Sequence, residues 1–502
     1  MNEPCLFWDS PTPRGHSVNT TENKGLSRRD VIKTAGVIAA ASSLAGVAIP
    51  FVHGAGDDTI KMALVGCGGR GTGAIGDAMN AKGGPVKLVA MADAFKDKLD
   101  SSHKTLQSDG NIAKQMDVPD DRKFVGFDAY KHAMDCLKPG DIVVLTTPLA
   151  FRCPQFAYAI EKGLNVFMEK PITADGPTTK KMFKLGEESV KKNLKVGVGL
   201  MCRHCIVRGE LFKRIQDGAI GDITLLRAYR EKGPEANCFT PRVPKGMNEL
   251  EFQIRYFHGY LWASGGCYSD FLIHNIDECC WMKNAWPVMA QATGGRQYHE
   301  MNGVEMVDQN FDHYAVEYTF ADGTKLLLQG RTMDGCDPQE FASFATGTKG
   351  AAVISQSSHT PARSRIQTSF DLTKKQGVTW HGPKDEPNPY GLEWNDLLEA
   401  IRADKPYNEV KRGAEASLVG SMGRMAAHTG RLVKWDDILN CEHEFAPNVD
   451  KFVIGGPAPL QADKDGRYPV PQPGKVTKQE YEDVALRSTG AQRGPQSSTV
   501  TK

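Results

Sequence analysis

The sequence lacks an excess of charge of either sign. Its 502 residues contain 61 Lys and Arg against 60 Asp and Glu, a formal net charge of +1 with histidine neutral. Because binding to nucleic acid draws on a surplus of cations, this balance argues against such a partner and leaves open only a local basic patch. Apolar residues at 40% and charged residues at 24% are typical of a soluble globular protein, and the length predicts two or three domains.

Long hydrophobic runs are almost absent too. The one uncharged stretch long enough to cross a membrane, residues 34–52, follows Arg28-Arg29 in Ser-Arg-Arg-Asp-Val-Ile-Lys and precedes a small-residue stretch at 53–56. This order is typical of a twin-arginine export signal, so we predict a cleavable signal over residues 1–55, with an uncleaved anchor or an amphipathic helix as alternatives. The expected location is the periplasm or another exported site, and the expected partner is the twin-arginine export machinery.

Paired cysteines are scarce as well. Among 12 cysteines only Cys202 and Cys205 form a C-x-x-C motif, whereas a structural zinc site normally takes its four ligands from two such pairs. We therefore expect no metal site and no disulfide framework, and we interpret the cysteines as buried or half-buried thiols.

What the chain does contain is a regular alternation of short apolar strands and helical patterns over its first 200 residues. This alternation implies right-handed βαβ units and a parallel sheet. The expected strands are residues 60–65, 86–93, 141–147, 165–171 and 194–201. After about residue 205 the runs lengthen, and "HYAVEYTFADGTKLLLQG" predicts a hairpin, so an open antiparallel sheet is expected there.

The predicted fold class is therefore α/β, with an N-terminal Rossmann doubly wound parallel sheet and a C-terminal α+β domain that holds a large open, mostly antiparallel sheet. We place the first domain at residues 56–200 and the second at 201–465, with the C-terminal helices packing back on the first. Residues 466–502 are predicted as a partly disordered tail, because its end is polar and low in bulky apolar groups.

A glycine-rich loop follows the first strand and precedes a helix. The pattern G-x-G-x-x-G is formed by Gly66, Cys67, Gly68, Gly69, Arg70 and Gly71. In this setting the first glycine permits a tight turn, the second lets the backbone approach a pyrophosphate, and the last lets helix and strand pack closely. The helix N-terminus supplies amide donors for phosphates, so the loop predicts a dinucleotide cofactor.

Asp93 ends the second strand, about 20 positions after Gly71, where a carboxylate accepts hydrogen bonds from the adenosine ribose. A carboxylate there repels a 2′-phosphate, which favours NAD over NADP. Two alternatives stay open: Asp93 as a solvated turn residue, and Arg70 as a cation that grips a phosphate and admits NADP.

Two further stretches carry a family resemblance. "DIVVLTTP" with "AIEKGLNVFMEKPIT", and "ASGGCYSDFLIHNIDECCW", resemble the fourth and fifth strands and the Asp–His segment of the Gfo/Idh/MocA oxidoreductases, over about residues 60–440. The resemblance implies a nicotinamide cofactor and a substrate-binding second domain that pairs into a homo-oligomer, a dimer or tetramer. It also implies that the cofactor lies against Thr147, Pro148, Glu169 and Lys170.

The Asp–His segment makes chemical sense on its own. Removing hydride from a carbinol carbon leaves a hydroxyl proton, and histidine titrates near working pH, so His274 is the candidate base. Asp270 lies four residues earlier on the same helical face and is expected to orient the His274 ring, and Asp277 to bind a substrate hydroxyl. Lys170 follows the fifth strand and is expected to polarise the reacting oxygen. A structural lysine and a core histidine are the alternatives.

Two arginines complete the expected site. Arg203 follows the sixth strand and is predicted either to reach substrate or to form a surface ion pair. Arg152 stands where relatives often carry His or Asn near the nicotinamide, so its guanidinium changes the charge beside the cofactor.

The expected function is an exported oxidoreductase that transfers hydride between a tightly bound NAD and a sugar, cyclitol or related polyol. Free cofactor is scarce outside the cell, so the dinucleotide is expected to remain bound and to be restored within each cycle. The alternatives are an NAD-dependent glycoside hydrolase or lyase that works by transient oxidation, and a non-catalytic sugar-binding protein of the same fold.

Overall fold

The computed structural model describes residues 58–478, 480 and 481. The predicted signal segment, and with it the export prediction, lies outside the described residues. Within the described part of the chain, no helix combines the length and the hydropathy needed to cross a membrane.

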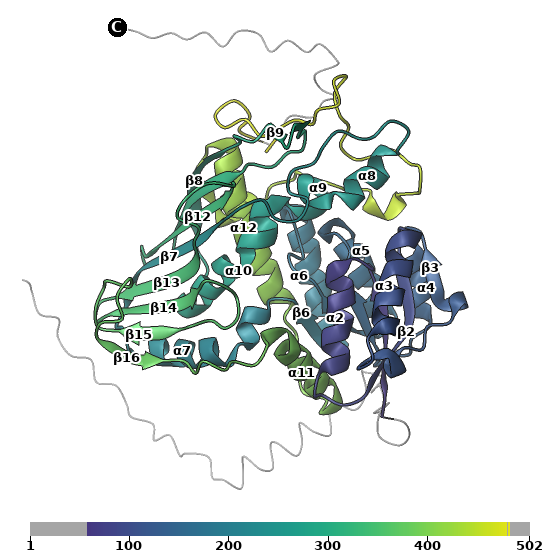
Figure 1. The fold of residues 1–502 in the computed structure, drawn as a ribbon, viewed down its shortest axis with the longest axis horizontal. Helices are drawn as coiled ribbons and strands as arrows, with labels where there is room; N and C mark the ends of the chain where they lie inside the picture. The colour runs from purple at the N-terminus through teal and green to yellow at the C-terminus, as the bar shows by residue number, and fades with distance from the viewer. Residues whose placement is uncertain (1–57, 479, 482–502) are drawn as a thin grey trace, which may run out of the picture. The chain divides into compact units, whose positions relative to one another are not determined.

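A six-stranded parallel sheet forms the first part of the fold, drawn in purple and blue in Figure 1. Its strands run in the order β3-β2-β1-β4-β5-β6. They are β1 (Ile60–Val65), β2 (Val86–Asp93), β3 (Lys123–Val125), β4 (Ile142–Leu145), β5 (Asn165–Met168) and β6 (Val196–Val198). Because both faces are covered by helices, β4 and β5 are buried at every position and read as continuous apolar runs rather than alternating ones.

Helices connect these strands and cover the sheet. They are α2 (Gly69–Asn80), α3 (Lys96–Ser108), α4 (Ala129–Asp135), α5 (Arg152–Glu161) and α6 (Gly176–Lys191), with the 3-10 turns η1 (Ala113–Gln115), η2 (Asp120–Arg122), η3 (Leu149–Phe151) and η4 (Met201–His204). The chain leaves β1 toward β2 on one side, whereas β4 lies on the other. This reversal opens a crevice at the carboxyl ends of β1 and β4, the usual ligand site of such sheets.

A nine-stranded sheet forms the second part, drawn in teal and green. Its order is β16-β15-β14-β13-β7-β12-β11-β8-β17, and only the β7–β12 pair is parallel. The strands are β7 (Ile223–Lys232), β8 (Met289–Gly295), β11 (His313–Thr319), β12 (Lys325–Thr332), β13 (Phe341–Gly347), β14 (Ala351–Gln356), β15 (Arg365–Gln367), β16 (Val378–His381) and β17 (Val433–Lys434), and β9 (Glu300–Met301) pairs separately with β10 (Val304–Glu305). The predicted fold class is thus confirmed.

Two long buried helices cover one face of the large sheet. The helices of this part are α7 (Ile206–Gln216), α8 (Glu249–Arg255), α9 (Leu261–Ser264), α10 (Gly266–Lys283), α11 (Pro389–Arg402), α12 (Val410–Thr429) and α13 (Trp435–Leu439), with η5 (Phe257–Gly259) and η6 (Val449–Lys451). α10 packs on β7 and β13, and α12 packs on β8, on α10 and on α6 of the parallel sheet (Figure 1). Gly423 permits this approach, because a Cβ there would lie 2.1 Å from the Tyr318 hydroxyl.

The structure corrects the expectation that all cysteines are thiols. Cys238 and Cys267 form a disulfide, with their Cα atoms 5.9 Å apart. The sequence does not predict this pair, because the two residues are 29 positions apart and no local motif links them.

The last described residues are held by a buried ionic cluster. The Glu480 carboxylate accepts hydrogen bonds from Nε and Nη2 of Arg424, at 2.7 and 2.8 Å, and lies 2.9 Å from Nδ1 of His428. All three side chains are at most 2% exposed. Burial alone would raise the pKa of Glu480, but Arg424 and His428 lower it to about 2. Glu480 thereby ties the last described residues to the C-terminal part of α12.

We expect Glu480→Gln to lower the free energy of unfolding by about 3–5 kcal/mol, because it leaves the Arg424 guanidinium buried without a counter-ion. Urea unfolding at neutral pH measures the change. Glu442→Gln, at an exposed position, is the matched control and should unfold like the unmodified protein. Equal midpoints for the two variants would show that the cluster does not stabilise the fold.

Candidate active site

A cavity of about 450 Å³ lies where the carboxyl end of the parallel sheet faces α10. Its walls come from the glycine loop, from the segments after β4 and β5, from α10 and from the loop after β14. A second cavity, of about 260 Å³, shares Gly68 and Thr147 with it and extends to Asp93. Together the two cavities run along the carboxyl ends of the parallel strands.

The glycine loop has the geometry that its sequence predicts. Gly66 has φ +98°, and a Cβ there would lie 2.7 Å from the amide nitrogen of Thr147. A Cβ at Gly71 would lie 2.0 Å from the carbonyl oxygen of Gly66, so only glycine lets α2 start this close to β1. Gly68 and Gly69, in contrast, face open space at the N-terminus of α2. The loop therefore leaves room for a pyrophosphate beside the free amides of α2.

Asp93 lies at the far end of the second cavity. Its carboxylate accepts hydrogen bonds from the amides of Cys67, at 2.6 Å, and Phe95, at 2.8 Å. Burial raises the pKa of Asp93 above its usual value, although these two amides act in the opposite direction. Cys67 is buried, and burial together with Asp93 raises the pKa of its thiol well above the usual value. Asp93 is thus fixed in position, with lone pairs left for ribose hydroxyls.

Arg70 lines the cavity but is bonded to acidic side chains. Its Nε donates to Glu169 at 2.5 Å, its Nη1 to Asp77 at 3.1 Å, and its guanidinium lies 4.8 Å from the centre of the Tyr390 ring. Burial and the nearby Glu169 raise the pKa of Glu393, which lies 3.6 Å from the same guanidinium, well above its usual value. Glu169 and Asp77 thus hold Arg70, and the structure gives no support to a grip on a phosphate. Glu169 acts by holding Arg70.

Arg152 is a buried residue in the wall of the cavity. It donates to the carbonyl oxygens of Leu145 and Thr147, and its side chain is about 1% exposed. Burial lowers the pKa of Arg152 to about 10, so it remains a cation at neutral pH. It therefore braces the end of β4 and places a fixed positive charge beneath Thr147 and Pro148.

Lys170 and Asp270 meet across the cavity. Lys170, just after β5, donates from Nζ to the Asp270 carbonyl oxygen at 2.7 Å and lies 3.4 Å from Oδ1. The other carboxylate oxygen of Asp270 lies 3.2 Å from Nε2 of His258. Burial alone would raise the pKa of Asp270, but Lys170 and His258 lower it to about 2, so it is ionised.

His274 lines the same cavity but does not have the predicted partner. The carboxylate of Asp270 faces Lys170 and His258, and Nδ1 of His274 has no hydrogen-bond partner among the described residues. Its ring centre lies 4.5 Å from that of His359. Spacing on a helix brings two side chains to one face but does not make them bond, and here residues from other segments compete for Asp270.

The protonation state of His274 follows from its surroundings. Burial, then the neighbouring His359, Lys170 and Arg230, lower the pKa of His274 well below its usual value. The ring is therefore neutral at physiological pH, the form that accepts a proton.

Asp277 and Arg203 bind each other rather than the cavity. Arg203 donates from Nε and Nη2 to the two oxygens of Asp277, at 2.9 and 2.8 Å, and stacks 5.1 Å from the centre of the Trp281 ring. Asp277 is about 1% exposed, and neither residue lines the cavity. The structure therefore does not place them where the prediction of substrate binding needs them, and Arg203 forms an ion pair that is largely buried rather than on the surface.

Among the cavity-lining side chains that sequence reasoning missed are His258, Arg230, His359 and Tyr390. Arg230 contacts Nε2 of His359 at 3.2 Å and pairs with Glu235. These residues come from η5, β7, the loop after β14 and α11, so no local spacing connects them. The sequence offered one indication of these residues, namely that His258 lies seven residues before the Gly265-Gly266 turn that precedes α10.

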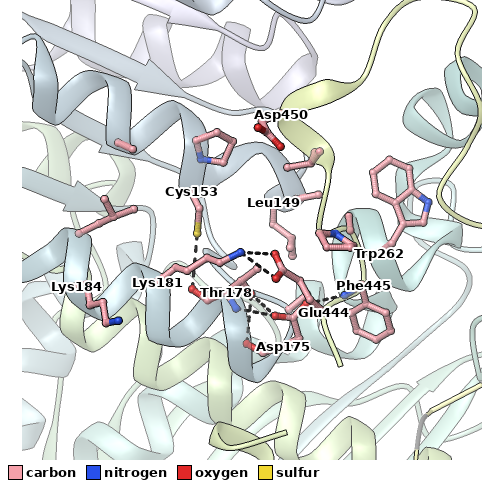
Figure 2. A pocket seen from close by; sticks show the side chains of 18 of the residues that line it. Leu149, Cys153, Asp175, Thr178, Lys181, Lys184, Trp262, Glu444, Phe445 and Asp450 are labelled. Carbon is pink, nitrogen blue, oxygen red and sulfur yellow. Dashed lines mark hydrogen bonds and ion pairs between the residues drawn. The ribbon is translucent and has the colours of Figure 1, made fainter. Parts of the chain in front are cut away.

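A larger cavity, of about 550 Å³, lies between α5, α6 and the segment after α13 (Figure 2). Lys181 pairs there with Glu444 at 2.6 Å, and burial raises the pKa of the Cys153 thiol to about 12. None of the predicted site residues lines this cavity. We therefore assign the candidate active site to the cavity of Lys170 and His274.

Comparisons with known proteins agree with the fold. No family model matches the chain. The inositol 2-dehydrogenase of Corynebacterium glutamicum is 25% identical over 125 residues, which are 25% of this chain and 35% of that protein. The matched stretch thus spans much less than the whole relative.

Solved structures share the architecture over 75% of this chain and 99% of theirs. They include an aldose-aldose oxidoreductase from Caulobacter crescentus complexed with glycerol (TM-score 0.55, 16% identity) and a myo-inositol 2-dehydrogenase from Lactobacillus plantarum (TM-score 0.53, 20% identity). A levoglucosan dehydrogenase in complex with NADH and levoglucosan has a TM-score of 0.55 at 16% identity. At these identities the likeness establishes the fold.

His274 and His359 are both expected to make stability depend on pH. The pKa of each is lowered by burial in the folded protein, whereas in the unfolded chain it lies near 6.5. The unfolded chain therefore binds more protons near and below that pH, and each histidine removes about 1 kcal/mol of stability between pH 6.5 and 5.5. In His359→Gln this loss should be smaller by that amount, as measured by urea unfolding at several pH values. His381→Gln, on the surface, is the control; an unchanged pH slope in His359→Gln would contradict the assignment.

Proposed function

We propose that the protein is an oxidoreductase that transfers hydride between a nicotinamide cofactor and a CH–OH group of a sugar, cyclitol or related polyol. The observation that carries this proposal is that Lys170 and His274 line one cavity with the glycine loop. His274 can accept the hydroxyl proton, and Lys170 can stabilise the oxygen that loses it. Both side chains therefore lie in the same cavity as the N-terminal end of α2, where we expect the phosphates to bind. The fold shared with sugar and inositol dehydrogenases supports the same reaction class.

The residues fit a dinucleotide. Gly68 and Gly69 leave space at the N-terminus of α2, Asp93 lies at one end of the paired cavities, and Lys170 lies at the other. A bound nicotinamide would supply the hydride acceptor. We propose NAD rather than NADP, because the fixed carboxylate of Asp93 repels a 2′-phosphate and Arg70 is held by acidic side chains.

Lys170, His274 and Asp270 each have a different role in the proposed reaction. Lys170 holds the substrate oxygen by its ammonium group, which favours the negative charge that develops there. The neutral ring of His274 takes the hydroxyl proton, and the cations around it limit how long that proton stays. Asp270 remains ionised and keeps Lys170 in place.

Lys170→Met and His274→Gln should each lower kcat by about 10²–10⁴-fold, because each removes a group that contacts the reacting oxygen or its proton. The assay screens sugars, cyclitols and glycosides by the absorbance of reduced nicotinamide, with product analysis to detect glycoside cleavage. Lys184→Met, a lysine of the other cavity, is the control and should retain activity. Full polyol oxidation by the double variant would refute the catalytic assignment.

We further propose that the protein is exported by the twin-arginine route with its cofactor already bound. The Cys238–Cys267 disulfide supports this, because disulfides persist in oxidising compartments and are rare in the cytosol. A route that moves folded proteins allows the dinucleotide to be loaded first.

The mature protein, purified from the periplasm without added nucleotide, should therefore release about one NAD per chain when it is denatured. Chromatography of the released nucleotide distinguishes NAD from NADP. An empty protein that binds added NAD only weakly would contradict retention, and release of NADP would contradict the cofactor choice.

We also propose that the chain forms a dimer or tetramer through the large sheet. α10 and α12 cover one face of this sheet, whereas Leu327 on β12 and Leu432 near β17 are 36% and 52% exposed. Exposed apolar side chains on an open sheet face favour pairing with a second copy.

A further inference from the structure

We propose that His258 is a further positioning residue of this site. It carries protons on both ring nitrogens and, as an imidazolium, holds the Asp270 carboxylate beside Lys170. The part of this inference that concerns turnover rests on the proposed oxidoreductase function, whereas the protonation of His258 does not.

The orientation of the Asn237 amide is the first step. Nδ2 of Asn237 donates to the carbonyl oxygen of Arg255 at 3.0 Å, and its Oδ1 accepts from the backbone amide of His258 at 3.3 Å. A backbone carbonyl only accepts and a backbone amide only donates, so these two contacts fix which end of the side chain is oxygen. That oxygen lies 2.5 Å from Nδ1 of His258. Nδ1 must therefore carry a proton.

The other ring nitrogen faces a second acceptor. Nε2 of His258 lies 3.2 Å from Oδ2 of Asp270. Burial works against ionisation of Asp270, but Nζ of Lys170 lies 3.4 Å from the other oxygen of this carboxylate and lowers the pKa of Asp270, so the carboxylate carries no proton of its own. An ionised carboxylate only accepts hydrogen bonds, so Nε2 must carry a proton as well. Two acceptors on opposite sides of one ring are satisfied only by the imidazolium.

The position of His258 fits a role in the site. It lies in η5, lines the cavity of Lys170 and His274, and stacks on Phe271 with ring centres 5.4 Å apart. Its side chain is 13% exposed. The aromatic neighbour and the Asn237 hydrogen bond leave the ring little freedom to turn away from Asp270.

This arrangement changes the charge at the reacting oxygen. Asp270 is shared between two cations, Lys170 and His258, so one positive charge stays uncompensated beside the substrate. That charge favours the alkoxide-like oxygen that develops as hydride leaves, while the neutral His274 takes the proton. Without His258 the carboxylate would neutralise Lys170 alone, and its orientation would be free to change.

The protonation is tested directly, without turnover. In protein labelled with ¹⁵N-histidine, long-range ¹H–¹⁵N spectra at pH 7.5 should show a histidine with both ring nitrogens protonated that is absent from His258→Gln. Because acidic neighbours raise the pKa of His204 to about 9, a His204→Gln sample identifies the signal of that residue. A neutral tautomer assigned to His258 would overturn the proposal, even in a protein that oxidises no polyol.

The effect on catalysis is tested on a substrate that the unmodified protein turns over. His258→Gln keeps a donor for Asp270 but lacks the charge, and it should lower kcat by about 10–100-fold, with an unchanged Km for NAD. Asn237→Leu removes the acceptor from Nδ1 and should give a smaller loss of the same kind. His299→Gln, an exposed histidine, is the control. An unchanged kcat in His258→Gln, at an unchanged melting temperature, would contradict the positioning role.

Discussion

The contact between Lys170 and Asp270 joins the two halves of the fold at the point where the chemistry is proposed. Lys170 follows β5 of the parallel sheet, and Asp270 lies in the first turns of α10, which covers the nine-stranded sheet. Because Nζ of Lys170 bonds the backbone carbonyl of Asp270 as well as approaching its carboxylate, the contact depends on the helix itself. His274, one turn further along, is thereby placed opposite the glycine loop.

α10 can carry this site because its buried charges are paired with partners from outside the helix. Asp270 is matched by Lys170, Asp277 by Arg203 and Glu278 by Arg208. An unpaired charge buried this deeply would lower the stability of the fold by several kcal/mol. The ion pairs therefore determine which side chains of α10 are left free to act on a substrate. His274 has no such counter-charge and is surrounded by cations and apolar groups, which keeps it neutral.

Much of the fold could be predicted from the sequence, and the site only in part. The alternating strands and the glycine loop follow from local rules, namely burial on both faces and contacts that a Cβ would prevent at Gly66 and Gly71. Lys170 and His274 were predicted and do line one cavity. The partner of Asp270 was predicted wrongly, because its oxygens lie beside His258 from η5 and Lys170 just after β5, and spacing along one helix reveals neither contact.

By itself the sequence determined what depends on neighbours along the chain: which segments become strands or helices, where the backbone must turn tightly, and which face of α10 carries Asp270 and His274. Only the tertiary structure decided what depends on distance through space. Tertiary packing pairs Arg70 with Glu169 and Arg203 with Asp277. It also brings Cys238 and Cys267 together in a disulfide and places His258 and His359 in the cavity. The physical reason is that ionic interactions and hydrogen bonds form between groups that lie close together in a suitable geometry. Packing between distant segments of the chain determines which groups those are.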